Sequence, residues 1–143
     1  KCKFGWITVK EEKDMIISIN FGKSKNIGNS EVLKNFKKKF KSFLDQKTNK
    51  LNPKILMNGS KLQIKIWQEL KKIPYGKTKS YGEIAKKVKT SPRYVGNVCG
   101  QNKHLIVIPC HRVIKSDGSL GGYSAPGGIK IKKMILNLEG SRI

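Results

Sequence analysis

The sequence predicts a mixed α and β protein of class α/β (α+β), with a small N-terminal hairpin-and-helix unit and a mainly helical C-terminal domain that contains a helix-turn-helix. Three observations predict this class: two β-leaning runs near the start, apolar residues at helical spacing in several later segments, and two short helices across a brief turn. We place residues 1–58 in the first unit and residues 59–143 in the second. A chain of 143 residues has room for one domain with such an appendage.

The N-terminal unit is predicted to be a hairpin followed by one helix. Trp6–Val9 and Met15–Phe21 are β-leaning runs, and the charged residues 10–14 join them. From Ser30 onward, apolar residues recur at three- and four-residue spacing with lysines between them, as in an amphipathic helix. Residues 45–58 contain Asn, Pro and Lys with little periodicity, so we expect a linker there.

The C-terminal domain is predicted to begin and end with a helix. Ser60 and Gln63 have capping-box spacing, and the apolar face that follows them ends at Ile73, before a proline. The last helix has one apolar face and brings Glu139 close to its end. That face consists of Ile131, Met134, Ile135 and Leu138.

Two short helices between them form the predicted helix-turn-helix. Ser80 and Glu83 make a second capping box, and Ser91 is an N-cap followed by Pro92 at the first helical position. The connection between the two helices is short, which is typical of this DNA-binding motif. An ordinary helical hairpin that only packs against the core is the alternative.

The segment around Cys110 is the strongest candidate for chemistry. The apolar run 105–108 predicts a buried strand that Pro109 ends, so the strand would deliver the thiol to its rim. A cysteine with His111 and Arg112 beside it has surroundings that favour the reactive thiolate. The alternative is an inert buried cysteine. Because neighbouring side chains on a strand point to opposite faces, His111 would need a water or a turn to reach the thiol.

The charge balance predicts a polyanionic partner. Thirty-one Lys and Arg against nine Asp and Glu give a net charge of +22. Nucleic acid is the first candidate, an anionic membrane surface is the second, and a lysine-rich composition without specific meaning is the third. The three cysteines have no Cys-x-x-Cys spacing, so we expect no disulfide framework, no metal site and a reducing, cytoplasmic location. No apolar stretch approaches the roughly 20 residues that span a membrane.

Several strings together resemble the O6-alkylguanine-DNA alkyltransferases, also called methylated-DNA–protein-cysteine methyltransferases. In the family's order from Ser60 to Glu139 they are Ile73-Pro74-Tyr75-Gly76, Ser80-Tyr81-Gly82-Glu83-Ile84-Ala85, Arg93 with Val95-Gly96, Asn102, Ile108-Pro109-Cys110-His111-Arg112-Val113-Ile114 and Gly121-Gly122-Tyr123-Ser124. The resemblance implies a monomeric single-use repair protein. It would bind double-stranded DNA, flip out a guanine alkylated at O6, and move the alkyl group onto its own cysteine without any cofactor.

The resemblance also implies the catalytic roles. Cys110 would accept the alkyl group, and His111 would take its proton through water. Glu139 would hold the imidazole in the required tautomer, Asn102 would brace the turn before the active segment, and Tyr81 would help guanine to leave as a neutral base. From the residues alone, Glu139 would be an exposed helix-end carboxylate and Asn102 a helix cap.

Substrate and DNA contacts are implied in the same way. The guanine pocket would use the backbone carbonyls of Val113 and Cys110, the Tyr123 ring and the Ser124 backbone N–H. The DNA surface would comprise Ser80, Tyr81, Arg93, Tyr94, Gly96 and Ser116. Arg93 would enter the duplex in place of the flipped base.

Two features depart from the family pattern, and three alternative functions stay open. Tyr94 stands where many relatives carry alanine, and Ala125-Pro126 alters the pocket loop. A lesion-binding protein without chemistry is the main alternative, which the presence of Cys110 opposes. A helix-turn-helix regulator and a cysteine hydrolase are two further alternatives, and nothing in the sequence specifies the oxyanion hole that a hydrolase needs.

Overall fold

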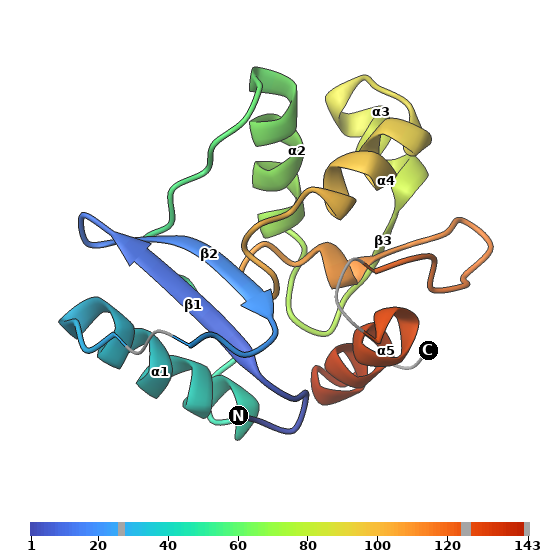
Figure 1. Cartoon of the computed structure of the whole chain (residues 1–143). Helices are drawn as coiled ribbons and strands as arrows, with labels where there is room; N and C mark the ends of the chain where they lie inside the picture. The colour runs from blue at the N-terminus through green and yellow to red at the C-terminus, as the bar shows by residue number, and fades with distance from the viewer. Residues whose placement is uncertain (26–27, 124–126, 142–143) are drawn as a thin grey trace.

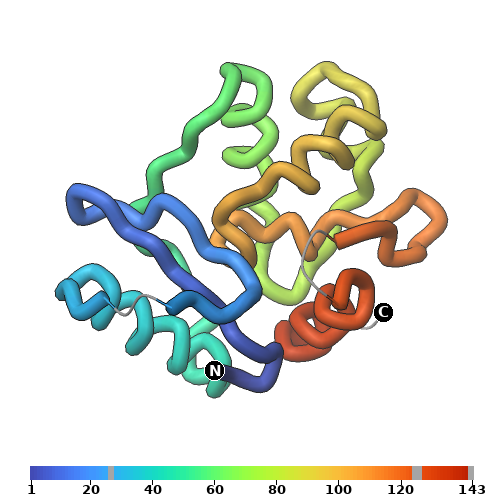
Figure 2. Tube along the Cα trace, viewed as in Figure 1, coloured from blue at the N-terminus to red at the C-terminus, as the bar shows by residue number. Residues whose placement is uncertain are grey.

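In the computed structural model, described over residues 1–25, 28–123 and 127–141, a two-stranded hairpin lies between one helix and a group of three others. Figure 1 shows α1 along one side of the hairpin, α2, α3 and α4 on the other side, and α5 at the lower right, below β3. The trace in Figure 2 brings the N-terminus beside the end of α1, where the Lys3 ammonium donates a hydrogen bond to the Leu44 carbonyl at 3.4 Å. The mixed α and β class predicted from the sequence is confirmed.

The hairpin consists of β1 (Ile7–Glu12) and β2 (Met15–Phe21), which pair antiparallel. The expected first strand, Trp6–Val9, was too short, because charged residues 10–12 belong to β1. The turn needs only Lys13 and Asp14, both of which have positive φ angles (50° and 65°), as in the two-residue turns that suit a twisted hairpin. Exposed charged side chains can occupy the outer positions of a strand, so charge alone does not end one.

Helix α1 (Glu31–Leu44) covers the hairpin with its apolar face. Ser30 caps it, since the Ser30 hydroxyl accepts a hydrogen bond from the Leu33 N–H at 3.2 Å. Phe36 is buried against Ile16 and Ile19 of β2, and Phe43 packs in a second cluster beside α5. The lysines of α1 remain on its outer side. The predicted helix from Ser30 onward is confirmed.

The three helices beyond the hairpin are α2 (Lys61–Lys71), α3 (Tyr81–Val88) and α4 (Pro92–Gly100). Both predicted capping boxes are present, at the starts of α2 and α3, and Ser91 caps α4 with proline at its first position. Lys89 ends α3 in the left-handed conformation (φ 60°), which lets the chain turn within three residues into α4. The apolar faces of all three helices meet in the largest core cluster.

Residues 105–108 do not form the strand that their apolar run predicted. Ile106 has a φ of 75°, which reverses the chain between Leu105 and Ile108. Leu105 and Ile108 enter the helical core, whereas Ile106 and Val107 enter the two clusters that involve the hairpin and α1. The run is apolar because it supplies three separate clusters, and a short apolar run alone does not distinguish this arrangement from a buried strand.

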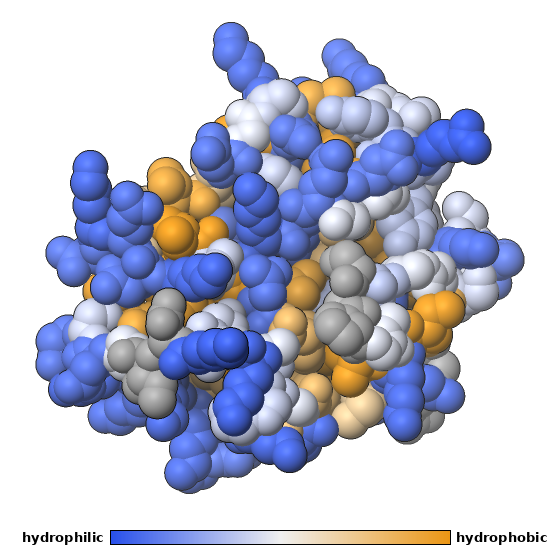
Figure 3. All heavy atoms as spheres, in the orientation of Figure 1, coloured by the Kyte–Doolittle hydropathy of each residue, from blue (hydrophilic) through white to orange (hydrophobic). Residues whose placement is uncertain are grey.

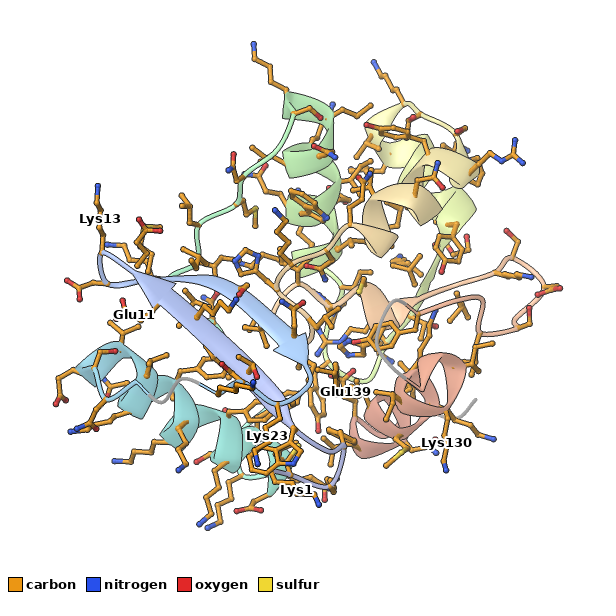
Figure 4. All side chains as sticks on the ribbon, viewed as in Figure 1. Lys1, Glu11, Lys13, Lys23, Lys130 and Glu139 are labelled. Atoms are coloured by element: carbon orange, nitrogen blue, oxygen red, sulfur yellow. The ribbon has the colours of Figure 1, made fainter. Side chains whose placement is uncertain are left out.

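The chain then forms the 3₁₀ turn η1 (Cys110–Arg112) and β4 (Val113–Ile114), which pairs parallel with β3 (Lys79–Ser80). Helix α5 (Gly128–Leu138) follows a long loop, and Glu139 caps its C-terminus. Figure 4 shows Lys130 pointing outward from α5 and Glu139, directly after that helix, in the interior. The boundary at residues 58/59 stays a prediction, and all three core clusters draw on both sides of it.

Hydrophilic side chains cover most of the face drawn in Figure 3, with small apolar areas between them. The large apolar side chains that remain exposed in the described residues are Trp6, Leu56 and Ile129. Within the described ranges, none of the helices is both long and apolar enough to cross a membrane.

Candidate active site

Cys110 lies at the start of η1 and is buried. Its sulfur accepts a hydrogen bond from the Asn102 amide nitrogen at 3.2 Å, and the same nitrogen donates to the Ile108 carbonyl at 2.9 Å. Burial raises the pKa of the Cys110 thiol above its ordinary value, although the Asn102 hydrogen bond and the Lys132 charge act in the opposite direction. Burial of the thiol thus opposes the expectation that its surroundings favour thiolate.

His111 follows directly and is completely buried, with its Nε2 3.0 Å from a Glu139 carboxylate oxygen. A carboxylate that carries charge only accepts hydrogen bonds, so Nε2 carries the proton and Nδ1 keeps its lone pair. Burial lowers the pKa of His111, which keeps the ring neutral, while Glu139 acts to raise it. Among the described residues, Nδ1 has no hydrogen-bond partner. The ring therefore presents a free basic nitrogen beside the thiol-bearing residue.

Arg112, which the sequence predicted to favour the thiolate, instead completes a buried three-residue network with His111 and Glu139. Its guanidinium donates to both Glu139 oxygens, from Nε at 2.8 Å and from the terminal nitrogen at 2.6 Å. Burial alone would raise the pKa of Glu139, but the hydrogen bonds from Arg112 and His111 lower it to about 2. The guanidinium thus neutralises the carboxylate and does not serve the thiol. Its position next to His111 was the signal that could have identified this role.

The string Ile73-Pro74-Tyr75-Gly76 holds the end of α5 in place. The Ile73 carbonyl accepts a hydrogen bond from Arg112 at 2.8 Å, and the Tyr75 hydroxyl donates to the Leu138 carbonyl at 3.2 Å. Gly76 has a φ of 81°, and a Cβ there would lie 3.0 Å from the Glu139 carbonyl oxygen. Only glycine allows this close approach without strain.

Lys132 is a buried residue near the site that the sequence did not single out. It comes from α5, is fully buried, and donates to the carbonyls of Val113 at 2.6 Å, Leu120 and Gly122 at 3.2 Å. Burial lowers the pKa of Lys132 to about 8, against the raising effect of Cys110. The ammonium lies 5.7 Å from the centre of the Tyr81 ring. Lys132 therefore joins the loop before Tyr123 to β4, next to the candidate nucleophile.

A pocket of about 480 Å³ opens between the helix-turn-helix and this loop, and four predicted DNA-contacting residues line it. These are Tyr81, Arg93, Gly96 and Ser116. Burial raises the pKa of Tyr81 to about 12, so its hydroxyl stays protonated. Gly121, with a φ of 71°, makes room for it, because a Cβ at Gly121 would lie 3.1 Å from the Tyr81 oxygen.

The remaining predicted residues lie around this centre. The Ser80 hydroxyl caps α3, accepting from the Glu83 N–H at 3.0 Å, and the half-buried Tyr94 packs against the helical core. The Val113 carbonyl faces Lys132, which occupies one of its two acceptor positions. The Tyr123 ring meets Phe21 edge-on at 6.5 Å, and its buried hydroxyl has no partner among the described residues. Ser124 and Ala125-Pro126 lie outside the described residues.

The described ranges contain no group of three or more His, Cys, Asp or Glu side chains that could hold a metal ion. The site combines a buried thiol that accepts a hydrogen bond from Asn102 with an adjacent histidine whose Nε2 is paired with a carboxylate. That combination is typical of a nucleophilic cysteine.

Comparisons with known proteins agree with this geometry. Residues 61–141 match the family model described as 6-O-methylguanine DNA methyltransferase, DNA binding domain. A methylated-DNA–protein-cysteine methyltransferase of Metallosphaera sedula is 36% identical in an alignment of 143 positions that covers 98% of this chain and 90% of that one.

Two solved structures are similar over almost the whole chain. The crystal structure of the Mycobacterium tuberculosis O6-methylguanine methyltransferase has a TM-score of 0.85 at 28% identity, covering 99% of this chain and 90% of that one. The M. tuberculosis protein in complex with DNA has a TM-score of 0.83 at 28% identity, covering 93% and 85%. The chain therefore belongs to the family of the O6-methylguanine-DNA methyltransferases.

Proposed function

We propose that this protein repairs O6-alkylguanine in double-stranded DNA by moving the alkyl group irreversibly onto Cys110. The observation that carries the proposal is the set of contacts around one buried thiol: Asn102 donates to the sulfur, and the adjacent His111 has a free Nδ1 and a Glu139 partner. A helix-turn-helix lines the pocket next to it. The names of the relatives, methylated-DNA–protein-cysteine methyltransferase, support the same activity.

Proton transfer would begin the reaction. Because burial keeps Cys110 as a thiol, His111 takes its proton at Nδ1 through one bound water. The carboxylate of Glu139 then stabilises the imidazolium, and Arg112 keeps that carboxylate ionised and in place. The Asn102 amide and the Lys132 charge stabilise the thiolate that remains.

Alkyl transfer would follow as a single displacement. The sulfur attacks the alkyl carbon, an S–C bond forms, and the bond between that carbon and O6 of guanine breaks. The Tyr81 hydroxyl, kept protonated by its raised pKa, donates a proton so that guanine leaves neutral. The proton that His111 took from the thiol returns through water to the Tyr81 oxygen. Both residues then regain their starting protonation states, and the net change is from thiol and O6-alkylguanine to thioether and guanine. A thioether does not hydrolyse readily, and each molecule therefore acts once.

DNA would reach this centre through the helix-turn-helix. The exposed Arg93 at the start of α4 enters the duplex as the alkylated base flips into the pocket. Gly96 lets α4 approach the groove, and Ser80, Tyr94 and Ser116 contact the backbone around it. The net charge of +22 favours phosphate binding without sequence preference, which suits a protein that searches for lesions as a monomer.

The two units would divide the work. Residues 59–143 carry the DNA-reading and transfer residues, and residues 1–58 support them through the shared clusters. The reaction requires Cys110 as a free thiol, and Cys2, Cys99 and Cys110 are all free. We therefore place the protein in a reducing compartment, the cytoplasm or nucleus of its cell.

The test is to count guanines restored. A duplex with one O6-methylguanine is incubated with the protein and digested to nucleosides, and guanine gained per protein molecule is measured. Wild type and the matched control Cys2→Ala should restore one guanine per molecule, whereas Cys110→Ala should bind the duplex and restore none. Lesion binding without any restored guanine would identify a lesion-binding protein instead, and repeated turnover would identify a hydrolase-like enzyme.

A further inference from the structure

A chain of hydrogen bonds runs from the acceptor cysteine to the N-terminal hairpin through His104, to which no role has been assigned. The Asn102 amide nitrogen donates to the Cys110 sulfur at 3.2 Å, and the Asn102 carbonyl oxygen accepts from the His104 backbone N–H at 2.8 Å. The His104 ring then reaches the Ile16 carbonyl of β2 with its Nε2 at 3.1 Å. Three hydrogen bonds thus join the sulfur to the hairpin.

The His104 backbone N–H fixes which end of the Asn102 amide faces the sulfur. An amide side chain has one accepting and one donating end, and a rotation by half a turn exchanges them. Because the Asn102 oxygen is held by the His104 N–H, its nitrogen must point to Cys110. The opposite orientation would place an oxygen against the thiolate and disfavour it.

The Ile16 carbonyl accepts hydrogen bonds from two other segments of the chain. It accepts both the His104 ring and the Leu56 N–H at 3.0 Å, so β2, the 54–56 segment and the 102–110 loop meet at this one atom. Three residues further along β2, the Ile19 carbonyl accepts from the Leu105 N–H at 3.1 Å, and the Ile19 N–H donates to the Lys103 carbonyl at 2.7 Å. His104 is 4% exposed, so its ring has little freedom to move elsewhere.

We propose that His104 is a positioning residue for the alkyl-acceptor cysteine: its side chain ties the 102–110 loop to the Ile16 carbonyl and so holds the Asn102 amide in the orientation that stabilises the Cys110 thiolate. The Nε2 atom acts as a donor, because a carbonyl only accepts, and the neutral ring suffices. The N-terminal unit thereby contributes to the chemistry without touching the substrate. The consequence for repair rests on the proposed function, whereas the positioning effect itself concerns only the reactivity of the Cys110 thiol.

The experiment measures how fast Cys110 reacts with iodoacetamide as a function of pH, read by the mass of the Cys110 peptide. His104→Val removes the donor, and His104→Gln keeps a donor nitrogen at nearly the same reach. The matched control Ile19→Val weakens the same interface without touching the hydrogen-bond chain. The titratable groups around Cys110 are unchanged in every variant, as are Lys71 and Lys103 beside His104. They are Cys99, Lys132, Tyr81, Tyr123 and the adjacent His111 with its partners Glu139 and Arg112.

His104→Val should shift the midpoint of the Cys110 profile to higher pH. At neutral pH the reaction should slow by on the order of threefold to tenfold, the effect of one misplaced hydrogen bond, and the rates should converge at alkaline pH. His104→Gln and Ile19→Val should keep the wild-type midpoint. In an Asn102→Ala background, the His104→Val change has no amide left to orient and should cause no further shift. Should His104→Val fail to fold, His104→Asn, whose donor is too short to reach Ile16, replaces it with the same expectation.

The proposal is overturned if His104→Val keeps the wild-type midpoint, if Ile19→Val shifts it equally, or if the shift persists without Asn102. The same variants are then tested with a duplex that contains O6-methylguanine. Because iodoacetamide needs no DNA, absence of alkyl transfer in every protein would refute the proposed function while leaving the positioning result intact.

Discussion

Replacing Glu139 with glutamine tests the buried network at the base of the site. Glutamine keeps the shape of glutamate but has one accepting oxygen and one donating nitrogen. Three N–H groups, two from Arg112 and one from His111, point at the Glu139 oxygens in the native protein. In Glu139→Gln at least one of these donors must therefore face another donor, and the guanidinium loses its counter-charge.

The size of the effect follows from the pKa of Glu139. The protein lowers it from 4.5 to about 2. At about 1.4 kcal/mol per pKa unit, this is a contribution of roughly 3 kcal/mol to the free energy of unfolding at neutral pH. Breaking a buried ion pair by removing one partner costs roughly 3–5 kcal/mol in other proteins, which agrees. For a domain of this size we expect Tm to fall by on the order of 10 °C.

The sign of the pH dependence separates this explanation from simple loss of packing. The folded pKa of Glu139 is depressed, so its contribution is complete above the unfolded value of 4.5 and is lost as the pH falls through about 2. Glu139→Gln lacks the contribution at every pH. The stability difference between the two proteins should therefore shrink as the pH falls from 4.5 to about 2.

Urea unfolding at a series of pH values, followed by circular dichroism, measures this difference. Glu31→Gln is the matched control, because it makes the same charge change in a surface ion pair with Lys34. The Glu31 side chain is 85% exposed and the Lys34 side chain is 55% exposed. We expect the control to stay within about 0.5 kcal/mol of wild type. A Glu139→Gln difference below about 1 kcal/mol at neutral pH, or one that is equally large in acid, would refute the reasoning.

Three further predictions concern the pocket. Lys132→Met removes a buried donor from three carbonyls, so single-turnover alkyl transfer should slow by about tenfold or more in a protein that still folds; an unchanged rate would exclude the anchoring role. Arg93→Ala should slow transfer from duplex DNA by on the order of a hundredfold, with iodoacetamide reactivity of the acceptor thiol unchanged. Gly121→Ala should displace Tyr81 and slow transfer, whereas Gly118→Ala, which has a similar positive φ but no described atom within 4 Å of its added Cβ, should only destabilise the protein by about 1 kcal/mol; equal transfer rates would contradict this reading.

Much of the fold could be predicted because its helices carry their own signals. The hydroxyls of Ser30, Ser60, Ser80 and Ser91 each cap the helix that follows, and each lies directly before an apolar periodic segment. Such caps are local interactions, so a short stretch of sequence contains all the information that specifies them.

The 102–110 loop could not be predicted in the same way. Ile106 adopts a positive φ, which a branched side chain accepts only when its surroundings impose it. Those surroundings come from the hairpin, α1 and α5, which are distant in the sequence. An apolar run that divides among three clusters therefore has the same composition as a buried strand.

Some residues of the candidate site could be predicted from the sequence and others could not. Asn102, Cys110, His111 and Glu139 were predicted from the family strings, and the structure brings them together. Lys132 was missed because the chain is rich in lysine, and nothing in the sequence separates this buried one from exposed neighbours such as Lys130 and Lys133. Burial of a charged side chain is a property of the tertiary structure.

The central claim is that one alkyl group moves onto Cys110 and stays there. The most direct measurement is the intact mass of the protein during titration with a duplex that contains one O6-methylguanine, followed by peptide mapping. The account predicts a gain equal to one methylene per molecule, located on Cys110, that stops at one equivalent and is absent from Cys110→Ala. Tight binding of the duplex without a mass gain, or a gain on another residue, would contradict it.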